Sequence, residues 1–555
     1  MEKSLFQFIW KYSKKNQLAL TAITILTFPI LYISLELPKR IINDAIGGSG
    51  EDVAILGMNF TQTQFLLLLC VGFLLAVLVN GLLKMRLNTM KGVLAERLLR
   101  RFRFQMLSRM MRFPRSYFRT TSQGELVSMV TSEAEPMGSF MGEMVSQPVF
   151  QAGQMLTILT FLFAQSFWFG VASITLIPLQ AWLIPKLQRQ INLLNKSRIQ
   201  EVRKLAADIG DTAAGVSDIR TNGGMRHRQS LFSNRLGNLF GIRFQIYQKK
   251  FFMKFLNNFI NQLTPFFFYS VGGVLAIQGE ITVGALVAAL AAYKDLSSPW
   301  KELLAYYNQS QDMALRWEVV TERFAPSTLV KDALFEGQPD TQTSLSGDIK
   351  LQDVTVRDEH GHAILEDICL TIPQGAKVAI QTNSETTALA FSDLLTREVV
   401  PYRGHVQIAG HQLNQLHQSV VANRIGYASS KPHLFQGTLG ENLFMPFYAE
   451  PERDEQITAE LLEWQAESAR AGNSVDPFSS TWVAPELAGF QSCNEIKDWW
   501  FQLVEAAGTD DAMVRNMLRS CLVPGSQLEL TKAIVQLRPE IAKRLTAAGL
   551  DDIVH

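Results

Sequence analysis

Histidines are the residues of this chain whose number and grouping could support metal binding. Six of the eight lie in one part of the chain, as His360, His362, His405, His411, His417 and His433. A metal site needs ligands at spacings that one turn or hairpin can bring together. Only His360 and His362 are close in sequence, around Gly361, and the others follow separate turns. We therefore predict polar surface positions for these side chains and no metal site.

The four cysteines could act as metal ligands or disulfide partners. They are Cys70, Cys369, Cys493 and Cys521. Their separations match neither the close pairs of zinc sites nor the density of a disulfide-rich domain. Cys70 falls in a long apolar run, where a thiol behaves as a small hydrophobic side chain. The cysteines therefore indicate neither a metal site nor a disulfide framework.

Two further polar features fall within helical patterns. An arginine cluster occupies residues 97–103, and we predict that it covers a solvated or lipid-headgroup-facing side of a helix. Asn80 lies inside an apolar run, where a polar side chain more often bonds a neighbouring helix than a substrate.

The composition of the chain describes two unlike parts. With 555 residues the chain is longer than most single domains. Its net charge of +1 gives no reason to expect nucleic-acid binding. Nearly all the long apolar runs fall in the first ~300 residues, and the remainder has the composition of a soluble segment.

Six apolar runs are long enough to cross a bilayer as helices, which takes roughly 20 residues each. They cover about residues 17–37, 64–83, 147–165, 167–186, 255–278 and 283–300. Lysines precede the first run and no small-residue cleavage site follows it, so we expect an uncleaved span. The alternative, six buried helices of a large soluble protein, does not explain the one-sided distribution of charge.

Positive charge predicts the orientation of these spans. Residues 41–63 and 277–284 contain no Lys or Arg, whereas 84–119 contain eleven and 186–254 contain fourteen. Cytoplasmic segments carry the excess of Lys and Arg, so both termini and both long basic segments are predicted to be cytoplasmic. Residues 84–112 and 187–250 also keep helical spacing. At ~1.5 Å per residue, about 25 extra residues would extend nearly 40 Å beyond the bilayer.

The pattern changes after the last span. We expect a linker over 326–347, then short alternating strands from Ile349 to Ile380, with Pro373 and Gly375 marking turns. Beyond about residue 450 the pattern is helical again.

The membrane part resembles the ABC exporter family at three places. Residues 112–118 and 122–128 are similar to its first intracellular loop, 211–215 and 218–221 to its second, and 279–284 to the start of its last span. The resemblance implies coupling helices that press into nucleotide-binding domains. It places Tyr117, Phe118, Gly124, Glu125, Asp211 and Asp218 at their tips.

The resemblance continues into the soluble part. Residues 375–395 are similar to the strand, loop and helix that hold the phosphate-binding loop, and 404–410 to the following hairpin. Residues 425–442 are similar to the region around the family's glutamine-bearing loop, and 547–552 match weakly near the end. The implied fold is a membrane all-α, six-helix domain over 1–325 with long intracellular helices. A partial α/β nucleotide-binding-like domain follows over 348–445, and a helical extension or insertion over 446–555.

The phosphate loop lacks the residues that its chemistry requires. Such a loop needs glycines around the phosphates, a Lys on the β- and γ-phosphates, and a Ser or Thr on Mg²⁺. The corresponding residues are Thr382, Asn383, Ser384, Glu385, Thr386, Thr387, Ala388 and Leu389. Ala388 falls at the Lys position and Leu389 at the hydroxyl position. Glu385 adds a negative charge, and at ~4 Å and a dielectric of ~20 one such repulsion costs about 4 kcal/mol.

Other family positions are also altered. The adenine-stacking aromatic position falls near Asp358, and the metal-positioning Gln falls at Ser430. No signature motif and no strand ending in Asp-Glu is found. One interpretation is a non-catalytic relic kept for packing and coupling. The other is a chain that is cut short, although that would leave the altered phosphate loop unexplained.

These observations predict the membrane-spanning, path-forming half of an ABC-type exporter in the inner or plasma membrane, which alone does not hydrolyse ATP. ATP and Mg²⁺ are implied only by the resemblance, and no other cofactor is expected. The implied partner is a second half-transporter, as a homodimer or as a heterodimer with an ATPase-competent half. An amphiphilic substrate fits the scarcity of charge in the spans. The alternatives are a membrane scaffold or sensor, and a solute transporter that does not use ATP.

Overall fold

The computed structural model describes most of the chain as helix. It describes residues 2–46, 53–55, 58–165, 167–175, 177–278, 283–326, 329–335, 343–358, 360–429, 432–449, 451, 458–521 and 528–547. The chain divides into two compact units. The first is Met1–Leu329 with Ser468–Asn473, and the second is Val330–Glu467 with Ser474–His555.

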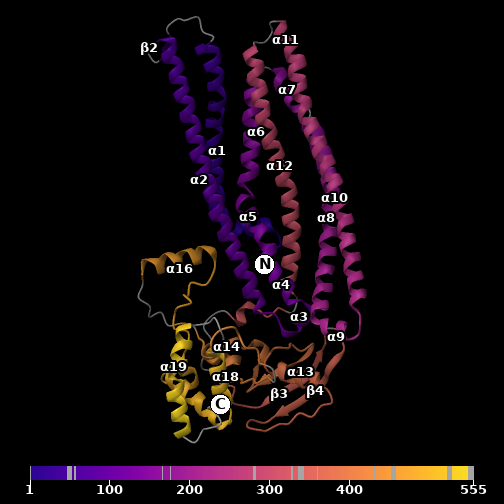
Figure 1. Ribbon diagram of the computed structural model, residues 1–555, viewed down its shortest axis with the longest axis vertical. Helices are drawn as coiled ribbons and strands as arrows, with labels where there is room; N and C mark the ends of the chain where they lie inside the picture. Colours follow the sequence, from indigo (N-terminus) through magenta and orange to yellow (C-terminus); the bar gives the residue numbers. More distant parts are fainter. Residues whose placement is uncertain are drawn as a thin grey trace. The chain divides into compact units, whose positions relative to one another are not determined.

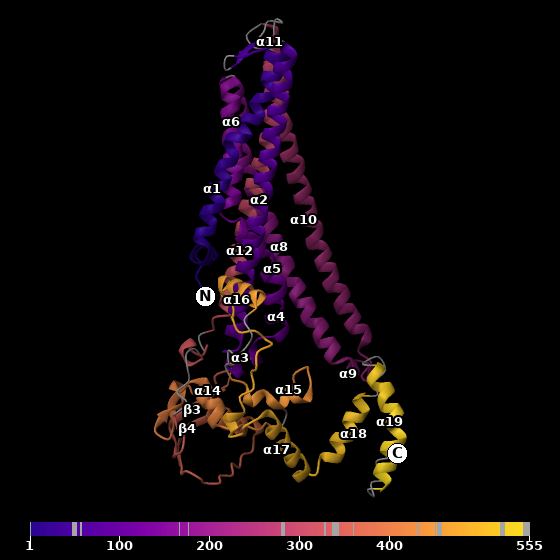
Figure 2. The ribbon, with the colours of Figure 1, turned by 90° about the vertical axis from the view of Figure 1, so that its left-hand side faces the viewer.

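The first unit is a bundle of long helices. They are α1 (Leu5–Arg40), α2 (Gln62–Met110), α6 (Ser146–Gln165), α7 (Phe167–Thr175), α8 (Ile177–Ala214), α10 (Met225–Phe267) and α12 (Val283–Arg323). Within this unit α1 lies beside α2, α6 beside α12, and α8 beside α10 (Figures 1 and 2). Each predicted span falls on helical residues, the fourth across α7 and α8 and the fifth from α10 into the short elements that follow it.

Short elements join the long helices. Between α1 and α2 lie a π-helical turn η1 (Ile41–Ile46) and a hairpin of β1 (Val53–Ile55) and β2 (Met58–Phe60). After α2 come α3 (Arg115–Thr120), α4 (Gln123–Ser128), the π-helical turn η2 (Met129–Glu133) and α5 (Ala134–Glu143). Helix α9 (Val216–Thr221) joins α8 to α10, and η3 (Phe268–Gly272) and α11 (Gly273–Ile277) follow α10.

Helix α2 has an exposed apolar half and a buried apolar half. Leu67 and Leu74 in its first half are 64% and 68% exposed, whereas Leu98 and Phe102 in its second half are 3% and 0% exposed. An exposed apolar surface of this length is what a lipid-facing segment requires. Among the described residues, two segments, Leu5–Pro38 and Gln62–Met110, are long and apolar enough to cross a membrane.

The core of the first unit is aromatic where α1, α2 and α12 meet. The rings of Phe8, Phe102 and Trp317 lie 4.8–5.8 Å apart between centroids, and each is almost fully buried. The indole of Trp317 donates a hydrogen bond to the carbonyl of Glu2 at 3.2 Å. A buried indole needs such an acceptor. This cluster holds the start of α1 against the second half of α2.

The second unit contains one four-stranded antiparallel sheet in the order β4-β3-β5-β6. Its strands are β3 (Ile349–Arg357), β4 (Ala363–Ile372), β5 (Arg403–Ile408) and β6 (His411–Gln412), and α13 (Glu385–Leu395) and α14 (Gln418–Arg424) share its core. The predicted hairpin at 404–410 is confirmed: Ala409 and Gly410 have φ of 51° and 82° and form the turn between β5 and β6.

The remaining elements are helices and short turns, as the sequence predicted beyond residue 450. The helices are α15 (Leu439–Phe444), α16 (Ala459–Ala471), α17 (Cys493–Ala506), α18 (Asp510–Cys521) and α19 (Leu528–Ala547). The 3₁₀ turns are η4 (Asp332–Leu334), η5 (Leu413–Gln415), η6 (Met445–Phe447) and η7 (Pro485–Ala488).

One predicted strand is wrong. Residues 376–380 form no strand, and Val378 and Ile380 are 53% and 49% exposed. A strand needs neighbouring strands to bond its backbone. The four described strands of this unit pair only with each other. The alternating apolar pattern alone was therefore not enough to form a strand, and none of the described strands lies beside these residues as a hydrogen-bonded partner.

Candidate functional site

The loop that follows α2 is fastened to the end of α12. The Tyr117 hydroxyl donates a 2.6 Å hydrogen bond to the carbonyl of Arg323, the last residue of α12. The guanidinium of Arg323 forms an ion pair with Glu125 on α4, with Nε and Oε1 3.4 Å apart. Arg323 thus contacts both parts of the predicted coupling loop. Because both charged side chains are partly exposed, the ion pair itself contributes at most about 1 kcal/mol.

The aromatic residues of this loop lie against the first unit's own core. The ring of Phe113 is 4.6 Å from Tyr117, 5.9 Å from Phe118 and 5.8 Å from Phe324 between centroids. Phe113 and Phe324 are buried, whereas Tyr117 and Phe118 are half-buried. Tyr117 therefore contacts the end of α12 directly, whereas Phe118 lies against Phe113. Gly124 is exposed and its nearest neighbour is the Ser122 hydroxyl.

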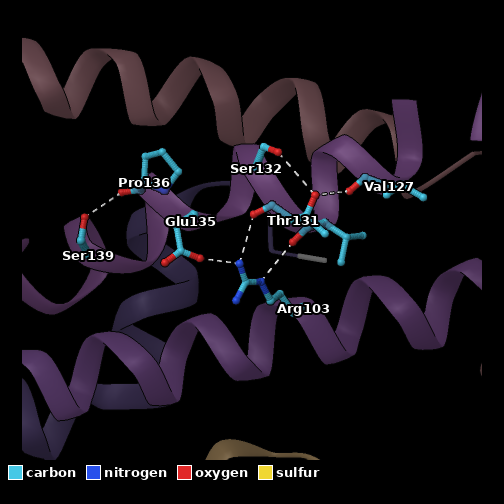
Figure 3. Close-up of polar contacts among 8 residues, drawn as sticks. Arg103, Val127, Thr131, Ser132, Glu135, Pro136 and Ser139 are labelled. Atoms are coloured by element: carbon cyan, nitrogen blue, oxygen red, sulfur yellow. Dashed lines mark hydrogen bonds and ion pairs between the residues drawn. The ribbon is translucent and has the colours of Figure 1, made fainter. Parts of the chain in front are cut away.

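Arg103 of α2 holds the segment that follows α4 (Figure 3). Its guanidinium donates to the carbonyls of Val130 and Thr131, each at 3.1 Å, and to the carboxylate of Glu135. Val130 and Thr131 lie in the π-helical turn η2, and wide turns of this kind are frequent at functional sites. Charge-assisted bonds of this type are about twice as strong as neutral ones.

Two further arginines of α2 contact a segment far away in the sequence. Arg100 donates to the hydroxyl of Ser468 at 2.9 Å, and Arg101 donates to the carbonyl of Arg470 at 3.2 Å. The Arg101 guanidinium also lies 4.3 Å from the ring centre of Tyr12. Arg100, Arg101 and Arg103 are half-exposed, but each also bonds another segment, so the predicted solvated or headgroup-facing surface over 97–103 describes them only in part. Local spacing shows where a basic face lies but not which distant segment meets it.

The second predicted coupling tip lies between α8 and α10. Asp211 is exposed in the last turn of α8, and its carbonyl accepts a 2.9 Å bond from the Gly215 N–H. Asp218 is exposed on α9, and its carbonyl accepts the Asn222 N–H at 3.0 Å. Their backbone groups close the turns and leave both side chains at the surface.

Arg235 joins the two helices near this tip. Its Nε lies 3.0 Å from Oδ2 of Asp208 on α8, and its NH1 lies 3.0 Å from Oε1 of Glu201. The hydrogen bond from Arg235 lowers the pKa of Glu201 below its ordinary value. The hydrogen bonds to Asp208 and Glu201 raise the pKa of Arg235. Ion pairs from one arginine of α10 to two carboxylates of α8 thus join the two helices.

The predicted phosphate loop forms the start of α13. Ser384 is the residue before the helix, and its N–H donates a 3.2 Å hydrogen bond to the Thr382 hydroxyl. From 376 to 389 no residue has a positive φ. A phosphate-binding nest alternates right- and left-handed backbone conformations, and these residues include no left-handed member. Asn383, Glu385 and Thr386 are exposed, and Thr387, Ala388 and Leu389 are half-buried.

Asp358, near the predicted adenine-stacking position, organises a turn instead. Its carboxylate accepts the N–H groups of His360 and His362 at 2.9 and 2.7 Å. Partial burial raises the pKa of Asp358, but the hydrogen bonds from His362 and His360 outweigh it, and the net pKa is lowered. Gly361 lies in this turn with a left-handed φ of 87°. Ser430 lies outside the described residues.

No described residues form a metal-like cluster: in the placed part of the chain, no three His, Cys, Asp or Glu side chains lie together as ligands would. The sites with the most specific geometry are therefore the arginine contacts of α2, the loop tips and the start of α13.

Comparison with known proteins agrees with this architecture. Residues 18–298, just over half of the chain, match the family described as the ABC transporter transmembrane region. A fatty acid ABC transporter ATP-binding/permease protein of Mycobacterium bovis is 23% identical over 433 residues, which cover 77% of this chain and 64% of that protein.

Two other relatives carry different names. The transport/processing ATP-binding protein ComA of Streptococcus pneumoniae is 21% identical over 68% of this chain and 52% of its own length. An ATP-dependent lipid A-core flippase of Burkholderia thailandensis is 23% identical over 65% of this chain and 60% of its own length. The chain thus spans less than two thirds of the length of these curated relatives. On the match of its transmembrane region, the chain is an integral membrane protein of the ABC exporter family.

Proposed function

We propose that this chain is the membrane-spanning, path-forming half of an ABC-type exporter whose own nucleotide site does not hydrolyse ATP. The observation that carries the proposal is the start of α13. There, a chain with the family's transmembrane region has neither the side chains nor the backbone of a phosphate loop.

These residues do not fit Mg²⁺-ATP. Where a Lys and a Mg²⁺-binding hydroxyl would be needed, Ala388 and Leu389 are half-buried apolar side chains. Glu385 is exposed in the first turn of α13, where a phosphate would have to approach. We therefore assign no step of ATP hydrolysis to this chain. A partner half with an intact site would have to supply hydrolysis.

Six membrane spans remain part of the proposal. All six predicted segments fall on helices, and the exposed apolar half of α2 supports a lipid-facing surface. The path would then be completed by a second half-transporter, either another copy of this chain or a different, ATPase-competent chain. The names of the relatives include a fatty acid transporter and a lipid A-core flippase, which favours an amphiphilic substrate here.

ATP hydrolysis by the purified chain tests the proposal. Reconstituted alone, it should show no Mg²⁺-dependent, vanadate-sensitive turnover above a protein-free control. Turnover that persists through a second affinity step, in a preparation where no other ATPase subunit is detected, would contradict a silent site. A partner that copurifies and brings such turnover would support the heterodimer.

A non-transporting scaffold or sensor is the second candidate. The segment around Val378 and Ile380 favours it, because these residues form no strand and are exposed, whereas a transporting domain would need an ordered phosphate-loop region. Transport of a fluorescent amphiphile into vesicles that hold the chain and its copurified partner separates the two. A scaffold would leave this transport unchanged when the chain is removed.

A further inference from the structure

A cavity of about 340 Å³ lies between α8 and α10 in the first unit. Its polar lining comes from both helices: Gln188, Asn195 and Arg198 from α8, and Arg243, Tyr247 and Lys250 from α10. Ile191 and Ile246 are buried and form its apolar wall. The cavity is therefore a built feature of the helix pair, with a mixed polar and apolar lining.

The charge of this cavity is one-sided. Arg198, Arg243 and Lys250 line it, and no carboxylate does so among the described residues. Nε of Arg198 is buried and has no hydrogen-bond partner within the described part of the chain. A buried charged donor without an acceptor is costly, so an anion in the cavity would stabilise it.

Arg235, also on α10, is an arginine whose charge is balanced within the pair of helices α8 and α10. It is held by two carboxylates of α8, Asp208 and Glu201, each at 3.0 Å. Arg243 lies eight residues further along α10 and faces a cavity that contains only cations and neutral groups. Since the same two helices supply carboxylates at one level and none at the next, the missing negative charge points to a ligand.

The cavity begins next to the membrane surface. The predicted spans end at residue 186 on α8 and begin at 255 on α10, so Gln188 and Lys250 lie within roughly 8 Å of those ends and Arg198 and Arg243 roughly 18 Å away. Trp182 is 64% exposed, and the Lys186 ammonium lies 5.1 Å from its ring centre. Exposed Trp and Lys together mark the interface of a membrane.

Exposed apolar side chains follow the cavity residues along α10 toward the predicted span. Phe251, Phe252 and Phe255 follow Lys250 and are 55–63% exposed, as suits contact with acyl chains. A soluble anion would bind only the cationic lining of the cavity, whereas a lipid would contact both this lining and the apolar rings. Arginine binds phosphate oxygens in a fork, and the amides of Gln188 and Asn195 add neutral donors.

We propose that this cavity binds the phosphate-bearing headgroup of an anionic lipid from the cytoplasmic leaflet. Arg198 and Arg243 hold the phosphate, Lys250 adds charge nearer the membrane, and the phenylalanines of α10 contact the acyl chains. Basic pockets between spanning helices on the cytoplasmic side suit such headgroups. The site does not depend on whether the chain transports anything.

Native mass spectrometry of the full chain tests this site. The protein is released from nanodiscs of phosphatidylcholine mixed with phosphatidylglycerol, and the lipids that remain bound are counted. The wild type should retain phosphatidylglycerol in preference to phosphatidylcholine. Arg198→Gln combined with Arg243→Gln should lower the retained phosphatidylglycerol at least fivefold.

The matched control is Lys196→Gln combined with Lys254→Gln. Both lysines are exposed on the same two helices and do not line the cavity, so the loss of charge is equal. Arg198→Lys keeps the charge without the fork and should retain an intermediate amount. Elution volume and circular dichroism establish that each variant is folded.

Three outcomes would overturn the proposal. Equal losses in the cavity variant and the control would mean non-specific attraction to a basic surface. Full retention in the cavity variant would mean that the lipid binds elsewhere. Displacement of the lipid by inorganic phosphate or ATP at equal concentration would mean a site for a soluble anion.

Discussion

Arg100 of α2 donates a 2.9 Å hydrogen bond to the hydroxyl of Ser468, a residue 368 positions later in the chain. Ser468 and Ala471 lie on α16 and are fully buried. Helix α16 ends with hydrogen bonds from the N–H groups of Gly472 and Asn473 to the carbonyls of Ala469 and Ser468. Guanidinium groups at a helix C-terminus are favourable because they meet its unpaired carbonyls. The end of α16 is thus a structural part of the membrane unit.

Substitution of Gly472 should loosen this contact. Gly472 has φ of +65°, and a Cβ there would lie 2.4 Å from the guanidinium carbon of Arg101, which already contacts Tyr12 and Arg470. Gly472→Ala should therefore cost the left-handed backbone penalty of about 1 kcal/mol and also displace Arg101. Hydrogen exchange of residues 459–473 should rise measurably.

Gly489→Ala is the matched control. Gly489 has φ of +80° but no atom within 4 Å of an added Cβ. The substitution therefore costs only the left-handed backbone penalty and causes no steric clash. If both variants leave exchange in 459–473 equally unchanged, the α16 contact contributes nothing to the order of this segment.

Apolar runs predicted the long helices well because each run is a local property. The exposed Leu74 and the buried Leu98 lie on one helix, and only their surroundings distinguish them. The hairpin that closes at Ala409 and Gly410 was expected from the family resemblance of residues 404–410. By contrast, the strand expected around Val378 depended on partner strands, which no local pattern reports.

The candidate site was predictable only in part, for the same reason. Tyr117 and Glu125 could be placed on a loop, but not their shared contact with Arg323, which lies 206 residues beyond Tyr117. The cavity beside Arg198 and Arg243 also went unpredicted. Its signal was present as two arginines on facing helices, but helix pairing is needed to bring them together.

Acid should loosen the pairing of α8 and α10. The folded-state pKa of Glu201 is lowered, so its contact with Arg235 stabilises the folded state above the unfolded pKa of about 4.3. That contribution is lost as pH falls through the folded-state value. Glu201→Gln should therefore flatten the fall of Tm between about pH 6 and pH 3. Glu302→Gln, at an exposed position on α12, serves as the control and should leave the slope as it is.

Cysteine labelling should reach the two sides of the membrane separately. Because the basic segments are predicted to be cytoplasmic, a Cys replacing Ser49 or Glu280 should react with an impermeant maleimide in intact cells. A Cys replacing Ser122 should react only after permeabilisation. Labelling at position 122 in intact cells would refute the predicted orientation. Positions 49 and 280 lie outside the described residues, so this result would add to the structure.

Removal of the coupling aromatics should separate transport from stability. The rings of Tyr117 and Phe118 lie against Phe113, and both side chains are half-buried. Half-buried rings contribute less than the 3–5 kcal/mol of fully buried ones, so Tyr117→Ala with Phe118→Ala should cost about 2 kcal/mol in total. If the exposed side docks on a nucleotide domain, substrate should no longer stimulate the ATPase of a partner half, while membrane insertion stays normal.

Two variants make this result interpretable. Tyr117→Phe keeps the ring and removes the hydroxyl that bonds the Arg323 carbonyl, so it should cost about 1 kcal/mol and keep the stimulation. Met111→Ala, at a 77% exposed position before the loop, should change neither property. In addition, a cysteine at 118 should cross-link to cysteines placed within 376–445 of this chain or of its partner. If the double variant lowers stability but leaves the stimulation intact, and no cross-link forms, the coupling role of these aromatics is excluded. The loop would then serve only to fasten α12.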